Sequence, residues 1–538
     1  MSHTLLRLQD EARQRLMKGA SALASALSPT LGPRSKCVLV DKKWGAPLVC
    51  NDGVTIAREV KLADPEEDLG VRILREAAVR TGDTVGDGTT TATLLAHALF
   101  SEGVRNIVAG ASAIDLKRGI ERGHRAAVAA IREASRPCGT RREREQIATV
   151  SAHNDPEIGA QVAEAMDRVG SEGVVSLEDA KGTETEIEAV EGLQFDRGFA
   201  SPYFVTNPDK VEAVLENPLL LLCEGKVTRL DQVVPLLEQI LKSGRPLLVV
   251  AEAVEGEALA TLVLNKLRGT FACAAVKAPG FGDRRKAIME DIAVLTGGRF
   301  LAEELGSTLE KAGIDDLGRA RRVVIDKDTT TIIGGAGDKA AIDARRAEIR
   351  RQVEQATSDY DREKLQERLA RLSGGVAVIR VGAPSEAEMK NRREAFDDAI
   401  AATRAAVAEG IVPGGGVALL RAIPAVEAAA RQCEGDERTG ALLLAHVLEV
   451  PLRQIAVNSG HDGGVVVDRV KGLAGATGFD AARNAYVDLV AAGIVDPTKV
   501  VRVALGNAVS VAGVLLLTEA TLTTIEEKAK EAPPVDGE

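Results

Sequence analysis

The spacing of hydrophobic residues changes twice along the 538-residue chain, and this change constrains the fold more than any other feature. Residues 8–27 and 64–135 place apolar side chains at helical spacing, and long helical segments return after Glu386. Between them, residues 174–222 show the shorter period of strands, and helices alternate with strands over residues 228–380. We therefore expect a multidomain α+β protein, mainly helical where its two ends pack together, with an α/β domain inserted in the middle.

The composition suits aliphatic cores and an acidic surface. Hydrophobic residues make up 45% of the chain, charged residues 27% and aromatic residues only 2%. The formal net charge is −11, whereas a protein that binds nucleic acid presents a basic surface. We therefore expect a soluble protein that does not bind nucleic acid.

The cysteines and the apolar segments bear on the cellular compartment. The six cysteines are scattered, without a C-x-x-C pair or a histidine at metal-ligand spacing, as free thiols of a reducing compartment are. The first residues mix charged with apolar side chains and form no signal-peptide segment. The longest apolar stretch, around residues 509–517, is shorter than the ~20 residues of a membrane span. These patterns predict a cytoplasmic protein that does not cross a membrane.

The sharpest local motif is GDGTTTAT at residues 86–93, which leads into an apolar helical segment. Glycines allow a ligand to approach the backbone, and the first N–H groups of a helix attract an anion. The threonine hydroxyls add donors, and Asp87 is suited to a Mg²⁺ ion that bridges phosphate oxygens. The alternative is structural, because Asp-Gly-Thr is also a good turn and helix start. A phosphate site here would not be a P-loop, because the chain has no G-x-x-x-x-G-K-[ST] motif.

Two further glycine motifs are NDGVT at residues 51–55 and GGG at residues 414–416. A lone Asp-Gly is usually only a turn, whereas three consecutive glycines cost backbone entropy and imply a close ligand or a close backbone. Residues 335–340 match the weak pattern G-x-G-x-x-A, but the strand and the acid of a dinucleotide site do not follow. We interpret that segment as a turn.

Aromatic and aliphatic residues gather in the middle of the chain. Four aromatic side chains lie within residues 195–204. Residues 228–244 and 255–269 are each apolar around more than half of a helix. This pattern indicates either burial on both sides within an α/β domain or an exposed apolar groove for a nonpolar partner.

Taken together and in order, these motifs resemble one family across essentially the whole chain, the bacterial 60 kDa (group I) chaperonins. The stretches that carry the resemblance are TLGP at 30–33, GDGTTTAT at 86–93, DLKRGI at 115–120, QFDRG at 194–198, VKAPGFG at 276–282, residues 357–368, GGG at 414–416 and DPTK at 496–499. Group II chaperonins share the phosphate motif but carry a lid insertion in the apical domain, for which this chain has no extra segment. The resemblance therefore favours group I.

The resemblance implies three domains. The expected parts are an equatorial ATP-binding domain of residues 1–134 and 410–525, an intermediate hinge domain of residues 135–190 and 377–409, an apical domain of residues 191–376, and a disordered tail of residues 526–538. This division agrees with the inserted domain that the hydrophobic spacing predicts.

By the same resemblance, the equatorial domain would bind ATP together with Mg²⁺ and K⁺. The residues expected at the nucleotide are Thr30, Leu31, Gly32, Pro33, Asn51, Asp87, Gly88, Thr89, Thr90, Thr91, Gly415, Asp480, Ala481, Ala482 and Asp496. Asp87 would bind Mg²⁺, and Thr30, Asn51 and Thr90 would surround K⁺. Asn51 stands where some relatives carry lysine, and Asp480 where relatives often have asparagine.

Asp398 and Asp52 are the catalytic residues that the resemblance implies. The family counterpart of Asp398 moves toward the nucleotide when ATP binds and activates the attacking water, with Asp52 as a second carboxylate. Carboxylates suit this role, because phosphoryl transfer depends on positioning and charge compensation. Without the resemblance, Asp398 would be interpreted as a solvated helix residue.

The resemblance assigns the apolar middle segments to a groove that binds non-native polypeptides and a lid co-chaperonin of the 10 kDa type. The residues expected there are Phe199, Tyr203, Phe204, Val234, Leu237, Leu259, Val263 and Leu264. Misfolded chains expose apolar side chains, and an adaptable aliphatic surface binds them with low specificity. Trp44 is expected at the tip of a hairpin that contacts a neighbouring subunit.

The expected function is therefore ATP-dependent folding of other proteins in a ring chamber that prevents aggregation. In the family, the homo-oligomer normally forms two stacked seven-subunit rings. One competing hypothesis is a paralogue that binds apolar polypeptides or serves as a scaffold without an effective ATPase cycle, which the retention of Asp52, Asp87 and Asp398 disfavours. Another is a small-molecule phosphotransferase, for which no acceptor site is evident.

Overall fold

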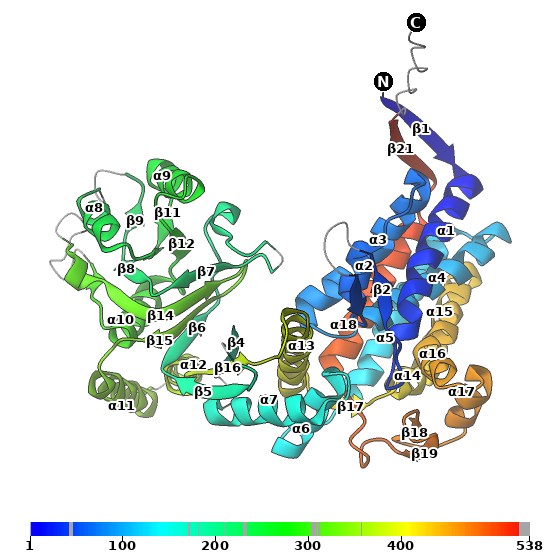
Figure 1. The fold of residues 1–538 in the computed structure, drawn as a ribbon. Helices are drawn as coiled ribbons and strands as arrows, with labels where there is room; N and C mark the ends of the chain where they lie inside the picture. The colour runs from blue at the N-terminus through cyan, green and yellow to red at the C-terminus, as the bar shows by residue number, and fades with distance from the viewer. Residues whose placement is uncertain are drawn as a thin grey trace, which may run out of the picture. The chain divides into compact units, whose positions relative to one another are not determined.

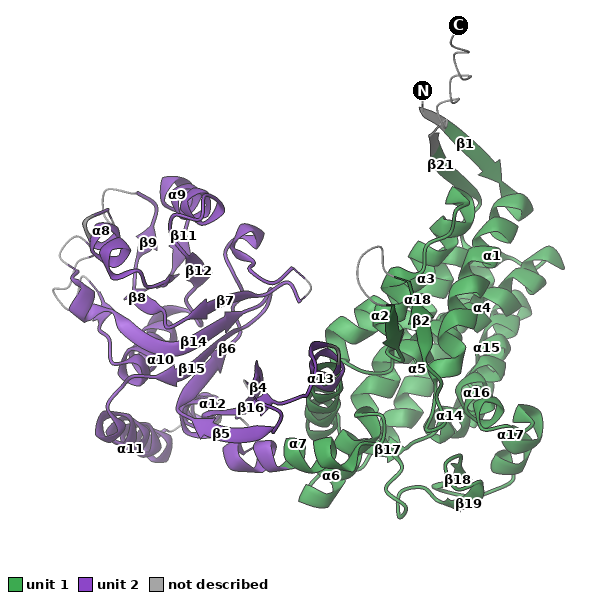
Figure 2. Cartoon of the chain, in the orientation of Figure 1, with its two compact units in different colours: residues 1–163, 393–538 green, residues 164–392 purple. Residues whose placement is uncertain are grey.

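The computed structural model describes residues 2–41, 47–170, 173–180, 182–208, 210–229, 234–302, 309, 312–356 and 358–526. The chain divides into two compact units (Figure 2). Unit 1 comprises residues 1–163 and 393–538, and unit 2 comprises residues 164–392. Unit 2 is thus inserted into the sequence of unit 1, and both helices and sheets are present, as the hydrophobic spacing predicts.

Unit 1 is mainly helical (Figure 1). Its first part contains β1 (Ser2–Leu8), α1 (Gln9–Leu27), η1 (Ser28–Thr30), β2 (Val38–Val40), β3 (Leu48–Cys50), α2 (Gly53–Glu59), α3 (Pro65–Val85), α4 (Thr89–Val108), α5 (Ala113–Glu133), α6 (Arg141–Ser151) and α7 (Pro156–Val169). Its second part contains α13 (Glu386–Glu409), β17 (Ile411–Pro413), α14 (Val417–Ala430), α15 (Gly435–Val447), α16 (Val450–Asn458), α17 (Gly463–Lys471), β18 (Thr477–Asp480), β19 (Ala485–Asp488), β20 (Val495–Pro497), α18 (Thr498–Leu516) and β21 (Ala520–Glu526). Helices α7 and α13 cross the boundaries of the unit.

The core of unit 1 is built by helices from both parts of the chain. Helix α18 packs on α3, α4 and α5, while α14 and α15 pack on α5. Helices α1 and α3 lie especially close, because a Cβ at Gly19 would be 1.8 Å from the Glu67 carbonyl oxygen and one at Gly70 would be 2.2 Å from that of Leu16. Small residues at such positions allow the aliphatic side chains around them to interdigitate.

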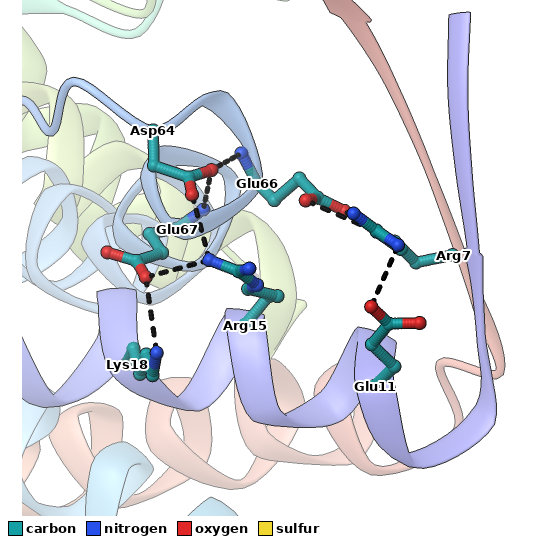
Figure 3. Close-up of polar contacts among 7 residues, drawn as sticks. All are labelled: Arg7, Glu11, Arg15, Lys18, Asp64, Glu66 and Glu67. Carbon is teal, nitrogen blue, oxygen red and sulfur yellow. Dashed lines mark hydrogen bonds and ion pairs between the residues drawn. The ribbon is translucent and has the colours of Figure 1, made fainter.

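Ion pairs join the start of the chain to the first turn of α3 (Figure 3). Asp64 caps α3 by accepting hydrogen bonds from the N–H groups of Glu66 and Glu67. Arg15 Nη1 lies 2.9 Å from Asp64 Oδ2 and 3.4 Å from Glu67 Oε1, and Arg7 Nε lies 3.2 Å from Glu66 Oε1. The acidic first turn also interacts favourably with the helix dipole. The start of α3 is thereby fixed on α1 and β1.

Short strands complete unit 1. Strand β1 pairs with β21 in an antiparallel register that runs from Ser2 opposite Glu526 to Leu8 opposite Ala520. Strands β2 and β3 form the expected hairpin, but Trp44 at its expected tip lies outside the described residues. Of the expected tail, Glu526 belongs to β21, and residues 527–538 lie outside the described residues.

The described residues of unit 2 form an eight-stranded sheet, a three-stranded sheet and a two-stranded sheet of β9 and β11, with helices around them. Its elements are β4 (Val174–Asp179), β5 (Glu186–Val190), β6 (Gly192–Phe195), η2 (Pro202–Phe204), β7 (Ala213–Glu216), β8 (Leu219–Cys223), β9 (Lys226–Val227), α8 (Val234–Ser243), β10 (Leu247–Ala251), β11 (Ala253–Val254), α9 (Gly256–Leu267), β12 (Cys273–Lys277), α10 (Gly282–Thr296), β13 (Phe300–Leu301), η5 (Ile314–Asp316), β14 (Gly318–Ile325), β15 (Thr330–Gly335), α11 (Lys339–Gln355), α12 (Asp359–Gly374) and β16 (Val376–Val381).

The main path of the eight-stranded sheet has the order β12-β10-β8-β14-β15-β6, and the three-stranded sheet has the order β4-β16-β5. Strands β12, β10 and β8 are parallel, with α8 and α9 in their connections, whereas β14 is antiparallel to β8 and β15. Parallel strands of this kind are covered on both faces, which explains the uninterrupted apolar sequences of β8 and β10. Within unit 2, α8 and α9 lie on one side of the sheet and α10 and α11 on the other (Figure 1).

Two helical stretches, Gly435–Asn458 and Thr498–Leu516, are long and apolar enough to span a membrane. In the sequence, only the contiguous apolar residues around 509–517 were considered, whereas the helix that contains most of them, Thr498–Leu516, is longer and also carries Lys499 and Arg502. About two thirds of each most apolar window is buried inside the protein, 67% and 61% respectively. Their apolar faces therefore belong to the core of unit 1.

Candidate functional site

Every residue predicted to contact the nucleotide or to act in catalysis lines one cavity of unit 1, whose volume is about 290 Å³. These residues come from the loop after η1, the start of α2, the turn between α3 and α4, helix α13, the turn before α14 and the segments around β18 and β20. The fold thus brings together residues that are separated by more than three hundred positions in the sequence.

The turn between α3 and α4 forms one wall of the cavity. Gly86 ends α3 and Gly88 begins α4, both with positive φ (71° and 77°) that favours glycine. A Cβ at Gly88 would lie 2.8 Å from Val500 Cγ1, so this position also has no room for a side chain. Within the described part of the chain no side chain caps α4, which leaves the first N–H groups of this helix and its positive dipole end at the cavity.

Asp87 lies between the two glycines and is held by two donors. Its Oδ1 accepts a hydrogen bond from the Gly88 N–H, and its Oδ2 accepts one from Ser151 Oγ at 2.7 Å. Ser151 is the last residue of α6 and lines the same cavity. Sequence analysis missed Ser151, because no local motif marks a serine at a helix end as a cavity residue.

The start of α2 packs directly on the start of α4. Asp52 caps α2 by accepting hydrogen bonds from Val54 N at 3.3 Å and Thr55 N at 2.7 Å. A Cβ at Gly53 would lie 2.5 Å from Thr90 Oγ1. The Asp-Gly pair is therefore a helix start enclosed by the cavity wall and not merely a surface turn.

Helix η1 and the loop after it form hydrogen bonds with the start of α4 and with the loop after β18. Thr30 Oγ1 lies 3.1 Å from Thr90 Oγ1, at the start of α4. Arg34 Nη2 donates to the Ala482 carbonyl oxygen at 3.0 Å. Asn458, at the end of α16, donates to the carbonyl oxygens of Ser28 and Leu31, both at 2.8 Å. Asn458 was also missed by sequence analysis, since an asparagine at a helix end usually indicates only a turn.

The opposite end of the cavity is formed around β18 and β20. Asp480 is buried and accepts hydrogen bonds from the N–H groups of Ala482 (3.0 Å) and Arg483 (3.1 Å), so its carboxylate stabilises its own loop. Burial, together with the negative charge of Asp87, raises the pKa of Asp496 to about 7. A Cβ at Gly414 would lie 2.9 Å from Asp496 Oδ1, which is the close approach that three consecutive glycines predict.

Asp398 faces this cavity from α13. Its pKa is raised well above the ordinary value, first by burial and then by the negative charges of Asp52, Asp87, Glu394 and Asp397. A group with these neighbours is not a solvated helix residue. The cavity thus places three carboxylates, those of Asp52, Asp87 and Asp398, near an uncapped helix start.

Unit 2 exposes apolar side chains on α8, α9 and η2, which we call the α8–α9 surface. Tyr203 is 63% exposed and Leu264 46% exposed, and Lys266 of α9 donates to the Val205 carbonyl oxygen, which places η2 beside α9. Four of the predicted residues are half-buried and pack against the core with one side, namely Phe199, Leu237, Leu259 and Val263. Val234, at the start of α8, is also half-buried.

A sequence profile of the TCP-1/cpn60 chaperonin family matches residues 23–526, which includes both units. The chain belongs to this family. It is 61% identical over 534 residues to Chaperonin GroEL 5 of Bradyrhizobium diazoefficiens, and the alignment covers 99% of each protein. The chain is therefore a group I bacterial chaperonin, as its motifs indicate, and it acts in protein folding. Chaperonins of this family bind ATP.

One residue predicted for the polypeptide groove of this chaperonin differs from the others in its burial. The side chain of Phe204 is fully buried, with 0% exposure, in the core of unit 2. A ring without exposed surface cannot contact a polypeptide in this conformation, so Phe204 supports η2 from within. Leu241 and Leu267, which were not predicted, are 45% and 60% exposed on α8 and α9.

Unit 2 of the chaperonin also has a cavity of about 330 Å³ between β6, α10 and α12. None of the predicted residues lines it. The cationic side chains at its edge are paired with acidic ones, such as Arg284 with Asp361 at 3.1 Å and Lys364 with Glu367 at 2.6 Å. The cationic side chains that line it are thus compensated by neighbouring carboxylates.

Proposed function

We propose that this chaperonin hydrolyses ATP in the unit 1 cavity and holds non-native polypeptides on the α8–α9 surface of unit 2. The observation that carries the proposal is the composition of the cavity wall, which combines an uncapped helix start with three carboxylates. A helix start is an anion site, and carboxylates supply metal binding and proton transfer. A cavity of this kind is suited to the triphosphate of ATP.

The residues present fit a nucleotide with its metal ions. Gly53 and Gly88 line the cavity and allow the starts of α2 and α4 to pack closely against Thr90 and Val500, and a Cβ at either position would collide with these neighbours. Among the described residues, no group of three or more His, Cys, Asp or Glu side chains could hold a metal. Asp87 would therefore hold Mg²⁺ jointly with phosphate oxygens, the arrangement that this ion prefers in nucleotide sites. When bound, Mg²⁺ neutralises negative charge that develops on the phosphate.

Thr30, Asn51 and Thr90 offer oxygen ligands for K⁺ beside the phosphates. Asn51 brings no positive charge, so charge compensation rests on the two cations and the start of α4. Gly415, Asp480, Ala481, Ala482 and Asp496 would line the base and sugar. Asp480 would act there mainly by shaping its loop, because its carboxylate already accepts two backbone hydrogen bonds.

Asp398 is the proposed general base for the attacking water. Burial and neighbouring carboxylates raise its affinity for a proton, which suits a group that takes a proton during the reaction. Asp52 is fixed by two backbone N–H groups and orients the water from the other side. Asp398 thus takes the proton and Asp52 positions the water, and phosphoryl transfer depends mainly on such positioning together with charge compensation.

The test is ATP hydrolysis in the presence of Mg²⁺ and K⁺, with the Asp398→Ala variant measured in parallel. Removal of a general base is expected to lower kcat by about 10²–10⁴-fold. Equilibrium binding of ATP to the variant should remain within about threefold, because the helix start and Asp87 are unchanged. No turnover by the assembled parent protein would instead support a passive polypeptide-binding paralogue.

The rest of the cycle follows from the family. We infer that identical chains assemble into two stacked seven-subunit rings in the cytoplasm, with equatorial, intermediate and apical domains at the boundaries given above. A lid co-chaperonin of the 10 kDa type would bind the α8–α9 surface in the presence of ATP and displace the polypeptide. Pull-down of such a lid with ATP and not without nucleotide tests this step, and absence of binding in both conditions contradicts it.

A further inference from the structure

Helix α13 presents three residues to the cavity region along one of its faces. Glu394, Asp398 and Ala401 follow one another at intervals of four and three residues, so they lie on the same side of the helix. Asp398 lines the cavity. Ala401 packs on the turn between α3 and α4 so closely that a Cβ at Gly86 would lie 2.2 Å from Ala401 Cβ. One side of Asp398 is therefore fixed by an apolar contact.

The other side is fixed by a hydrogen bond. Thr55 Oγ1, on α2, donates to Glu394 Oε1 at 2.8 Å. Thr55 also donates its backbone N–H to Asp52 Oδ2 at 2.7 Å. Nearly any residue at position 55 could make the contact to Asp52, because it uses the backbone N–H. The contact to Glu394 requires a side-chain donor. Thr55 thus joins the carboxylate at the start of α2 to the face of α13 that carries Asp398.

We propose that Thr55 and Glu394 are positioning residues for hydrolysis, and that their hydrogen bond fixes Asp398 at its place in the cavity wall. The proposal rests on the proposed ATPase activity. It adds two residues that do not line the cavity and therefore do not touch the substrate. Asp398 lies one helical turn from Glu394, so a loss of this contact moves the carboxylate without removing it.

The size of the expected effect follows from the geometry of proton transfer. A displacement of about 1 Å in a catalytic group can lower the rate by about a hundredfold. The contact between Ala401 and Gly86 remains in place when the hydrogen bond is lost, so a smaller displacement is expected. We therefore expect kcat to fall by about tenfold while the KM for ATP stays within about twofold.

Thr55→Val and Thr55→Ser form the matched pair that tests the role of the hydroxyl. Valine has nearly the shape of threonine but cannot donate, whereas serine retains the donor. Thr55→Val should lower kcat by about tenfold, and Thr55→Ser should retain at least about half of it. Thr439→Val is the control for a threonine-to-valine change in the same unit, because the bond of Thr439 Oγ1 among the described residues is to the Gly435 carbonyl oxygen within α15. Equal losses in the valine and serine variants, or a change confined to KM, would overturn the proposal.

Two Glu394 variants separate the hydrogen bond from the charge. Glu394→Gln keeps an acceptor oxygen and should retain more activity than Glu394→Ala. The double variant Thr55→Val with Glu394→Ala should be no slower than the slower single variant, because the two side chains act through one contact. Multiplicative losses in the double variant would show that the residues act independently and would contradict the proposal.

Hydrogen exchange gives a readout that does not depend on hydrolysis. Amides of residues 394–401 should exchange faster in Thr55→Val than in the parent protein, and Thr55→Ser should restore their protection. A parent protein without turnover would refute the proposed ATPase, while this exchange pattern would still establish the contact. Unchanged exchange together with unchanged kcat in Thr55→Val would refute the positioning role alone.

Discussion

The cavity of unit 1 and the α8–α9 surface of unit 2 are built on opposite principles. The cavity depends on backbone groups and on glycines at which a Cβ would collide with a neighbour, as Gly53 and Gly88 do. The α8–α9 surface depends on aliphatic side chains that are half-exposed and that pack on the core with one side only. Hydrogen bonds to a phosphate are directional, whereas apolar attraction scales with area and has no preferred direction.

This difference predicts how each region responds to a single substitution. In the cavity, one added methyl group shifts several hydrogen-bonding groups at once. On the α8–α9 surface, the loss of one side chain removes only its own share of the contact area. The four substitutions below test this contrast, in order of decreasing effect.

The largest effect is expected where the α8–α9 surface meets the core. Phe204→Ala should lower the free energy of unfolding by about 3–5 kcal/mol, because it leaves a cavity in the core of unit 2. Tyr203→Ala, next in sequence but 63% exposed, should cost no more than about 1 kcal/mol. Chemical denaturation measures the free energy of unfolding of both variants. Hydrogen exchange of the β10 and β12 amides shows whether the loss lies in unit 2. A stable Phe204→Ala variant with lost polypeptide binding would place Phe204 on the binding surface after all.

Gly53→Ala is expected to have the next largest effect. Its Cβ would lie 2.5 Å from Thr90 Oγ1 and would push the start of α2 away from α4. Binding of ATP should weaken by about a hundredfold, since positioning errors of about 1 Å have effects of this size. Gly139→Ala is the matched control in unit 1, because no atom of the residues that the structure describes lies within 4 Å of its Cβ position. Equal affinities of the two variants, measured by calorimetry, would contradict a cavity built on close approach.

Asp496 makes the stability of unit 1 dependent on pH. Its pKa is raised from 3.8 to about 7, so the folded protein binds more protons than the unfolded chain between these values. Stability should therefore decrease as the pH rises from about 4 to about 7 and then level off. Asp496→Asn removes the cost of ionising this buried carboxyl. The substitution should raise the free energy of unfolding at pH 8 by about 2–4 kcal/mol, with little change near pH 4. Thermal unfolding at both pH values tests the sign, and a variant that is less stable at pH 8 would contradict it.

Leu264→Ser should have the smallest effect. Leu264 is 46% exposed, and loss of its exposed apolar area is expected to cost about 1 kcal/mol of polypeptide binding, or about fivefold in affinity. Fluorescence anisotropy with a labelled, unfolded client protein measures this change. A hundredfold loss from this one substitution would mean that the α8–α9 surface has a specific pocket and would remove the contrast between the two regions.

The two regions also differ in how far the sequence predicts them. All the residues predicted for the nucleotide and for catalysis line the cavity. The motif GDGTTTAT marks one wall of it in the sequence, whereas Asp398 and the residues around β18 and β20 were assigned only through the family resemblance. Ser151, Asn458 and Glu394 were missed, since a polar residue on a helix has no local pattern that reveals a partner distant in sequence. On the α8–α9 surface, periodicity identified the apolar helices but did not reveal which side of η2 is buried. The burial of Phe204 beside the exposed Tyr203 was therefore not foreseen.

The pairing of β1 with β21, and of α18 with α3 and α4, has a consequence for protein synthesis. Strand β1 and helices α3 and α4 leave the ribosome early, but the helix and the strand that cover them are made last. Until then, their apolar faces stay open to other nascent chains, and unit 2 is complete before unit 1 can close. The contacts of β21 with β1 and of α18 with α3 connect residues several hundred positions apart in the sequence. Such distant contacts form slowly. A protein that folds other proteins thus exposes its own core during synthesis for longer than a chain with local contacts would.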